Sequence, residues 1–245
     1  MTDLYFKVLG PDGVCCHGGL GRWQTDGTWM PPIYGNLSPC VRGYHLCRAS
    51  DLIEWLGPVI WIAEGQKASF ISSKYVIFQE ARVVRSLDAW TPAVARLFAV
   101  ECAQRVSGLI TEIFPDETRP AVALQAARDF MAGKLDFVTM NKIAQEAWNA
   151  SRLQEGAVRD AAIAAYGAAV WESDGLAAWA AAGAARTAVA AAALEHSLAV
   201  DKENGVHPRD AERKANQAAA SALQVEREWQ TARLFDLLGD IEPQS

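Results

Sequence analysis

The sequence predicts an α+β protein in which a small, antiparallel β-rich N-terminal module is followed by an alanine-rich antiparallel bundle of about six helices. The first ninety residues hold ten of the eighteen glycines and five of the nine tryptophans, which is typical of strands and loops. No proline lies between Pro120 and Pro208, so long helices can form there. Within that stretch Leu176–Ala199 has thirteen alanines in twenty-four residues, and alanine has the highest helix propensity. We therefore predict two domains, residues 1–90 and 91–245.

The N-terminal module is expected to form its sheet from short apolar segments separated by turns. Residues 4–10, LYFKVLG, predict a first strand. The turn Pro11-Asp12-Gly13 predicts that Val14–His17 pairs back on that strand as a hairpin. Further strands are expected at Cys40–Cys47, Val59–Ala63 and Lys74–Val84, with a short helix at Asp51–Leu56 that Ser50 caps.

Helices account for the rest of the chain. Thr91 is expected to be the N-cap of the first one, with Pro92 at its first helical position. The helix that contains residues 176–199 is apolar nearly all round and should be buried, whereas Arg186 at its middle argues against a membrane span. Short connections favour antiparallel packing. The expected helices cover residues 92–111, 119–132, 136–154, 156–172, 175–201 and 210–238, with a sharp turn at Asn204-Gly205 before the last.

Composition and charge narrow the functional classes. The first ten residues, MTDLYFKVLG, do not have the pattern of a signal peptide, and five cysteines, an odd number, fit a reducing compartment, so we expect a cytoplasmic protein. The net charge is −6, and all of the acidic excess lies after residue 92. An acidic surface repels phosphate, which disfavours general nucleic-acid binding and is compatible with a basic protein partner.

A cysteine and histidine group in the N-terminal module is a weak candidate for a zinc site. Cys16, Cys40, His45 and Cys47 include enough soft ligands for tetrahedral coordination. The sequence has no C-x-x-C pair, and the adjacent Cys15 and Cys16 would point to opposite faces of a strand. The alternative is that the thiols are small buried side chains. We expect no cofactor and keep zinc as the alternative.

The helical region carries a set of charges close to the turn at Pro115. Arginine pairs bidentately with carboxylates, so such pairs could clamp the first two helices across this turn or line a polar cleft for a ligand or partner. No serine or cysteine lies in a recognisable nucleophile elbow, and the histidines are scattered, so we expect no catalytic residues. The charged candidates are Glu101, Arg105, Asp116, Arg119, Arg128 and Asp129.

Two further groups of residues are candidates for binding. Trp23, Trp29 and Tyr34 lie in a proline-rich loop, where they either contact a partner or fill the core of the module. His45, Glu80 and Arg82 are the residues of an alternative hypothesis, in which an enzyme or small-ligand binder has a cleft between the β module and the helices.

The helical half resembles a known family at several short motifs. They are ARLFAVECAQRV at residues 95–106, the turn Phe114-Pro115-Asp116, Arg119-Pro120 and Ala126-Ala127-Arg128. These motifs look like those of the bacterial family of putative immunity proteins found near polymorphic toxins and in phage-related loci. The family's late-helix histidine motif is partly matched by Glu195-His196. N-terminal pieces at residues 43–47, 55–58 and 80–82 resemble an uncharacterised module of bacterial and phage proteins.

The resemblance implies a non-enzymatic binding protein that neutralises a protein partner, as a toxin immunity protein or as a phage-type inhibitor of a bacterial defence system. It brings no catalytic residues with it. A structural component of a phage particle is a further alternative to the enzyme or ligand binder. The last helix could also form a homodimer through Ala215, Ala218, Ala222, Val225 and Trp229.

Overall fold

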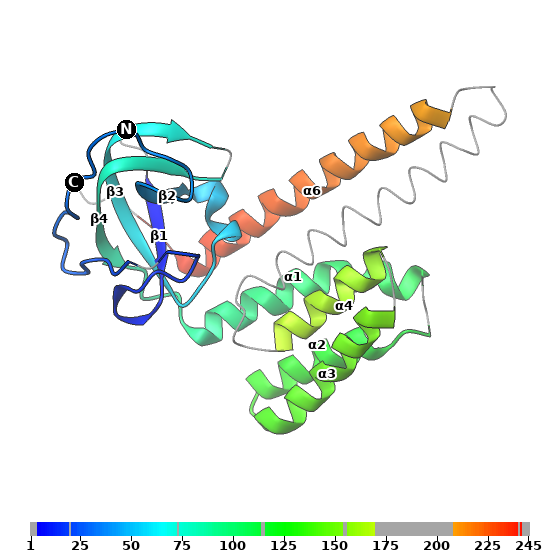
Figure 1. Cartoon of the computed structure of the whole chain (residues 1–245). Helices are drawn as coiled ribbons and strands as arrows, with labels where there is room; N and C mark the ends of the chain where they lie inside the picture. Colours follow the sequence, from blue (N-terminus) through cyan, green and yellow to red (C-terminus); the bar gives the residue numbers. More distant parts are fainter. Residues whose placement is uncertain are drawn as a thin grey trace. The chain divides into compact units, whose positions relative to one another are not determined.

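The computed structural model describes residues 4–19, 21–72, 74–113, 116–153, 156–169, 208–239 and 241. It divides the chain into two compact units, residues 1–95 with 231–245 and residues 96–230 (Figure 1). The helix predicted at 175–201 and the turn at Asn204-Gly205 lie outside the described residues. The predicted division into domains at residues 1–90 and 91–245 stays a prediction.

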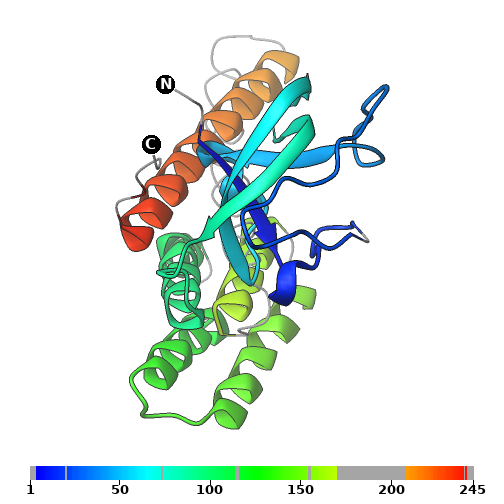
Figure 2. The ribbon, with the colours of Figure 1, turned by 90° about the vertical axis from the view of Figure 1, so that its left-hand side faces the viewer.

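The first unit is built on four antiparallel strands that close into a small barrel in the order β1-β2-β4-β3. They are β1 (Tyr5–Leu9), β2 (Tyr44–Arg48), β3 (Val59–Ile71) and β4 (Val76–Ser86). Figure 2 shows β3 and β4 as a long two-stranded ribbon. The predicted N-terminal antiparallel sheet is therefore confirmed, and it is closed because β1 pairs with both β2 and β3.

The hairpin predicted at the N-terminus is wrong. Phe6 lies opposite Cys47 on one side and Ile62 on the other, so both edges of β1 are occupied by distant parts of the chain. Residues Pro11–Gly13 form a 3-10 turn, as the proline and glycine favour, but Val14 then forms an isolated bridge with Arg22 instead of a second strand. Closure of the sheet thus overrides the local hairpin signal.

The second strand begins later than its apolar residues suggest. Cys40 and Gly43 have φ angles of 58° and 127°, values that a strand cannot contain, so the chain turns there and β2 starts at Tyr44. The predicted short helix is a 3-10 helix, η2, over Ala49–Glu54, and Ser50 lies inside it instead of capping it. Strands β3 and β4 occur where expected; β3 extends beyond its predicted end at Ala63 to Ile71, and β4 is displaced by two residues from the predicted Lys74–Val84.

The described helices follow the predicted order, and their capping is as expected where the sequence was specific. The backbone N–H of Val94 donates to Thr91 Oγ1 at 3.2 Å at the start of the first helix. Gly133, with a φ of 69°, follows the end of the second. The helices are α1 (Pro92–Ile113), α2 (Arg119–Met131), α3 (Phe137–Leu153), α4 (Gly156–Ala169) and α6 (Pro208–Leu238).

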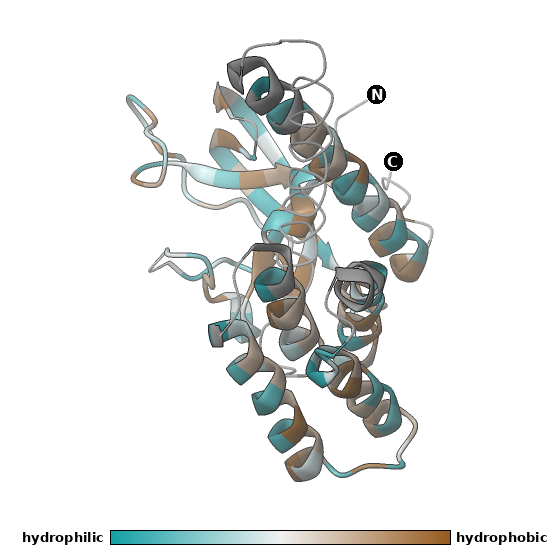
Figure 3. Ribbon diagram, turned by 90° about the vertical axis from the view of Figure 1, so that its right-hand side faces the viewer, coloured by the Kyte–Doolittle hydropathy of each residue, from teal (hydrophilic) through white to brown (hydrophobic). Residues whose placement is uncertain are grey.

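Small side chains form much of the core of the helical unit. Helices α2, α3 and α4 pack against one another pairwise, and Figure 3 shows hydrophobic and hydrophilic residues alternating along the described helices. Alanine lets helix axes approach closely. No helix within the described ranges has the length and apolar character needed to cross a membrane. The buried alanines include Ala123, Ala127, Ala144, Ala147, Ala162, Ala165 and Ala169.

The end of α6 belongs to the first unit. From Thr231 onward the helix is grouped with the barrel, and Leu234 and Leu238 are buried there. The ring of Phe235 packs edge-on against Phe6 of β1, with centroids 5.6 Å apart. The barrel core is therefore completed by a segment more than two hundred residues away in the chain.

Gly65 in β3 is predicted to be required by packing against β4. A Cβ at this position would lie 2.4 Å from Cγ of Phe78, so Gly65→Ala should lower the free energy of unfolding by about 1–3 kcal/mol through overpacking. Urea unfolding followed by circular dichroism would measure it. Gly21→Ala is the control, since a Cβ there meets no described atom within 4 Å beyond its chain neighbours. Equal midpoints for the two variants would contradict the packing argument.

Candidate functional site

A cavity of about 500 Å³ lies within the first unit. Strands β1 and β2, the loop after β1, the turn before β2 and the side chains of Trp55 and Tyr75 line it. Its volume falls within the range of roughly 300–1,000 Å³ typical of sites for small ligands. Aromatic side chains supply much of the wall, including Trp23, Tyr44, Trp55 and Tyr75.

Lys7 of β1 places an ammonium group in this cavity. Tyr5 and Leu9, two residues to either side, belong to the barrel's apolar cluster, and the period of a strand puts Lys7 on the same face. Its Nζ donates a hydrogen bond to the carbonyl oxygen of His45 at 3.2 Å and lies 5.0 Å from the ring centroid of Trp23. Burial lowers the pKa of Lys7.

The charge of Lys7 has no carboxylate beside it on the cavity wall. No Asp or Glu is among the described residues that line the cavity, whereas Arg22 is a second basic residue there. The groups that raise the pKa of Lys7 are the thiols of Cys15, Cys47 and Cys16, and their effect is smaller than that of burial. The cavity therefore combines an apolar, aromatic wall with positive charge.

His45 of β2 holds the turn that closes one side of the cavity. The backbone N–H of Cys40 donates to His45 Nε2 at 3.1 Å, so Nδ1 carries the proton and donates to the carbonyl of Gly43 at 3.0 Å. Desolvation by burial lowers the pKa of His45, and the charge of Lys7 acts in the same direction. The neutral ring thus fixes the Cys40–Gly43 turn and is not placed as a free base.

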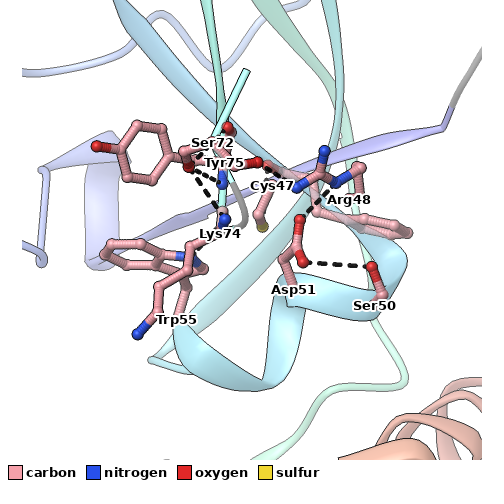
Figure 4. Close-up of polar contacts among 9 residues, drawn as sticks. Cys47, Arg48, Ser50, Asp51, Trp55, Ser72, Lys74 and Tyr75 are labelled. Carbon is pink, nitrogen blue, oxygen red and sulfur yellow. Dashed lines mark hydrogen bonds and ion pairs between the residues drawn. The ribbon is translucent and has the colours of Figure 1, made fainter. Parts of the chain in front are cut away.

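A polar network fixes the connection between β3 and β4 (Figure 4). Arg48 Nε donates to Asp51 Oδ2 at 2.6 Å, and Arg48 Nη2 donates to the carbonyl of Ser72 at 2.7 Å. The hydroxyl of Ser72 accepts hydrogen bonds from the backbone N–H groups of Lys74 and Tyr75. The connection is therefore joined to β2 and η2.

This network positions two aromatic side chains of the cavity wall. Trp55 Nε1 donates to the carbonyl of Lys74 at 3.0 Å, which anchors the indole beside the β3–β4 connection. The ring of Tyr75 lies 6.1 Å from that of Trp55 and 5.1 Å from that of His45. The three rings form a continuous aromatic border.

The candidate zinc ligands Cys16, Cys40, His45 and Cys47 all line the cavity. His45 has both ring nitrogens in hydrogen bonds. Cys47 is buried and donates to the carbonyl of Phe6 at 3.4 Å, and burial raises its pKa to about 12. No group of three or more His, Cys, Asp or Glu is placed to hold a metal ion in the part of the chain that the structure describes.

The three aromatic residues of the predicted contact loop have different surroundings. Trp23 is buried, with its ring 5.3 Å from that of Tyr44. Trp29 is half-buried beneath the guanidinium of Arg82, which is 5.0 Å from the indole centroid. Tyr34 is 73% exposed. Of the two alternatives that the sequence left open, Trp23 fits burial in the module, whereas Tyr34 is exposed on the surface.

Glu80 and Arg82 lie on the long β3–β4 ribbon, where each has an ionic partner. Arg82 Nη2 lies 2.7 Å from Glu64 Oε2, and Glu80 pairs with Lys67. Both side chains therefore form ion pairs on the surface of the β3–β4 ribbon. His45 is occupied by the Cys40–Gly43 turn, so the three residues of the alternative enzyme hypothesis have separate local roles.

The charged residues of the helical unit pair differently from the prediction. Arg119 forms a bidentate pair with Glu117, and Arg128 Nη2 donates to Gln104 Oε1, which connects α2 to α1. The contact of Arg128 between α2 and α1 is thus with an amide, and the arginine–carboxylate clamp across Pro115 stays a prediction. The carboxylate of Glu117 lies too close in sequence to Arg119 to join two helices.

Arg105 forms a long-range ion pair within this unit. Its Nε lies 2.9 Å from Oε2 of Glu226 in α6, and its guanidinium is 4.1 Å from the ring centroid of Trp229. The Glu226 side chain is 6% exposed and also accepts a hydrogen bond from Gln230 at 3.2 Å. Trp229, one of the predicted dimer residues, is thus engaged within the chain, whereas Val225 remains exposed.

Sequence reasoning did not identify Lys7 or Glu226. A signal existed for Lys7, because it is the one charged residue in YFKVL and shares a strand face with Tyr5 and Leu9. No local signal identified Glu226, which resembles the other charged residues of an amphipathic helix and pairs 121 positions away.

A family model matches the helical region of the chain. The model described as Imm-5 like putative immunity protein matches residues 93–236, which is more than half of the chain. The chain therefore belongs to this family. Neither the curated proteins nor the solved structures give a match. The matched region begins in α1 and ends in α6, so it does not include the strands that form the cavity.

The five cysteines are predicted to differ in reactivity. Cys16 and Cys40 are exposed, whereas Cys47 and Cys102 are buried and burial raises the pKa of both. Since the thiolate is the reactive form, a brief iodoacetamide treatment at about pH 8 should modify Cys16 and Cys40 first. Peptide mass spectrometry would identify the sites, and a denatured sample is the control. Early modification of Cys47 in folded protein would contradict the structure.

The Arg105–Glu226 pair is predicted to contribute to the stability of the helical unit. Arg105→Met would leave the buried Glu226 carboxylate without its cation and should lower the free energy of unfolding by up to about 3 kcal/mol, a low value for such a pair because Arg105 is 36% exposed. Combining it with Glu226→Leu should restore most of the loss. Chemical unfolding of the two single variants and the double variant measures this coupling, and strictly additive effects would contradict it.

Proposed function

We propose that this protein is a toxin immunity protein, a non-enzymatic cytoplasmic protein that binds and neutralises a protein partner. The observation that carries the proposal is the family match over residues 93–236. The second form of the same activity, inhibition of a bacterial defence protein by a phage-encoded relative, uses the same mode of action and differs in the partner.

The charge of the helical region supports a basic partner. Residues 93–245 contain twenty-one Asp and Glu against fifteen Lys and Arg, whereas residues 1–92 are balanced. An acidic surface steers a basic partner towards it and increases the association rate. Many toxins that act on nucleic acids need a basic surface for their substrate, so an acidic protein is suited to cover such a surface.

The corner between α2 and α3 provides an apolar surface for this contact. Met131, Phe137 and Val138 are exposed there, and Val138 is 76% exposed. Phe137 is held in place by edge-on packing against Phe130, with ring centroids 6.2 Å apart. We name these residues the α2–α3 corner. Ordered, exposed apolar side chains of this kind are typical centres of protein interfaces.

A carboxylate lies beside the α2–α3 corner. Asp136 accepts hydrogen bonds from the backbone N–H and the hydroxyl of Thr139, both at 2.9 Å. These bonds lower the pKa of Asp136, so the group stays charged at neutral pH. Negative charge next to an apolar centre matches a basic partner with an apolar patch.

The test is protection against a toxin encoded beside this protein's own gene. Co-expression with that toxin should restore growth of the host, and the purified proteins should form a complex by isothermal titration calorimetry. Val138→Arg should weaken the complex at least about tenfold, since it removes apolar contact and adds a repelling charge.

Ile71→Arg is the matched control, because Ile71 is a similarly exposed β-branched residue (70%) that lies outside the matched region and does not line the cavity. It should leave both protection and affinity unchanged. Protection without a direct complex, or a complex that both variants weaken equally, would overturn the assignment of the contact to the α2–α3 corner. Failure to protect against any toxin of the locus would overturn the proposed function.

A further inference from the structure

The cavity of the β module has chemical properties that the immunity function does not use. It lies outside the matched residues 93–236, and its wall is formed by residues far from the α2–α3 corner in sequence. A ligand in this cavity would therefore contact different residues from those proposed to contact the protein partner.

The positive charge in the cavity favours an anionic ligand. The ammonium of Lys7 lies in a largely apolar enclosure, with Arg22 on the same wall and no Asp or Glu among the described lining residues. Moving a charge out of water without a counter-ion raises its free energy. A bound anion beside the charge offsets this desolvation penalty. An ammonium has three N–H donors. Among the described contacts, Nζ uses one of them, for the carbonyl of His45.

The lining of the cavity favours a ligand with an aromatic ring. Trp23 and Tyr44 form an edge-on pair with centroids 5.3 Å apart on one part of the wall. Trp55 and Tyr75 form the border that the polar network of Ser72 holds in place. Aromatic rings offer favourable offset or edge contacts to another ring. A volume of about 500 Å³ accommodates a molecule with one or two rings.

We propose that this cavity is a binding site for a small aromatic anion, with its carboxylate, sulfonate or phosphate held by Lys7 and its ring packed against the aromatic wall that includes Trp23. Lys7 supplies the charge-assisted hydrogen bond that orients the ligand. The neutral His45 keeps the Cys40–Gly43 turn in the position that encloses it.

Two fluorescent probes with the same ring system test the proposal in the full chain. 1-Anilinonaphthalene-8-sulfonate carries the anionic group, and N-phenyl-1-naphthylamine lacks it. The sulfonate should bind saturably with one site per chain and roughly ten- to hundredfold more tightly than the neutral probe, which is the effect of one hydrogen bond to a charged group. Comparable affinities for the two probes, or no saturable binding of the sulfonate, would overturn the proposal.

Variants of Lys7 assign the effect to this residue. Lys7→Met should remove the preference for the sulfonate while the neutral probe binds as before, and Lys7→Arg should retain the preference. Lys67→Met is the control, since Lys67 is an exposed lysine of the same unit that pairs with Glu80 outside the cavity. Unchanged sulfonate affinity in folded Lys7→Met protein would also overturn the proposal. If that variant does not fold, the comparison of the two probes on the natural chain still decides.

Discussion

The pairing of β1 on both sides is the constraint on which the first unit depends. Strand β1 pairs with β2 at Tyr5 and Phe6 on one edge and with β3 along its whole length, Tyr5–Leu9, on the other, and this closes the sheet. Because side chains alternate along a strand, the same five residues send Lys7 into the interior with Tyr5 and Leu9, while Phe6 packs against Phe235 of α6. Strand β1 therefore contributes the lysine of the cavity and the ring that contacts the last turns of α6.

The two units differ in the charge and polarity of their candidate binding sites. The helical unit, which carries the family match, is a scaffold of closely packed alanines with an ion pair between α1 and α6. Its described surface offers an acidic and apolar corner suited to a protein. The β module instead encloses a positively charged, aromatic cavity suited to a small anion. The two proposed binding sites use different residues, which allows either proposal to be tested without the other.

Buried and half-buried polar groups fix the local geometry in both units. In the helical unit Glu226 contacts Arg105 and Gln230, and the guanidinium of Arg105 lies over the ring of Trp229. In the β module the half-buried His45 hydrogen-bonds to both ends of the Cys40–Gly43 turn. Each of these groups would be costly to bury alone, so each specifies a particular neighbour and a particular arrangement. The cysteines that suggested zinc line the same cavity, where Cys47 is buried and Cys16 and Cys40 are exposed.

The sequence by itself determined the α+β order, the helix start at Thr91-Pro92 and the end of α2 at Gly133, because capping and backbone preferences act over a few residues. It also located β3 and β4 from their apolar character. Only the tertiary structure decided that β1 pairs with β2 and β3 in place of a local hairpin, and that Arg105 meets Glu226 instead of a carboxylate near Pro115. These partners are tens to more than a hundred residues apart. Their choice depends on how whole elements pack, which no local pattern of residues encodes.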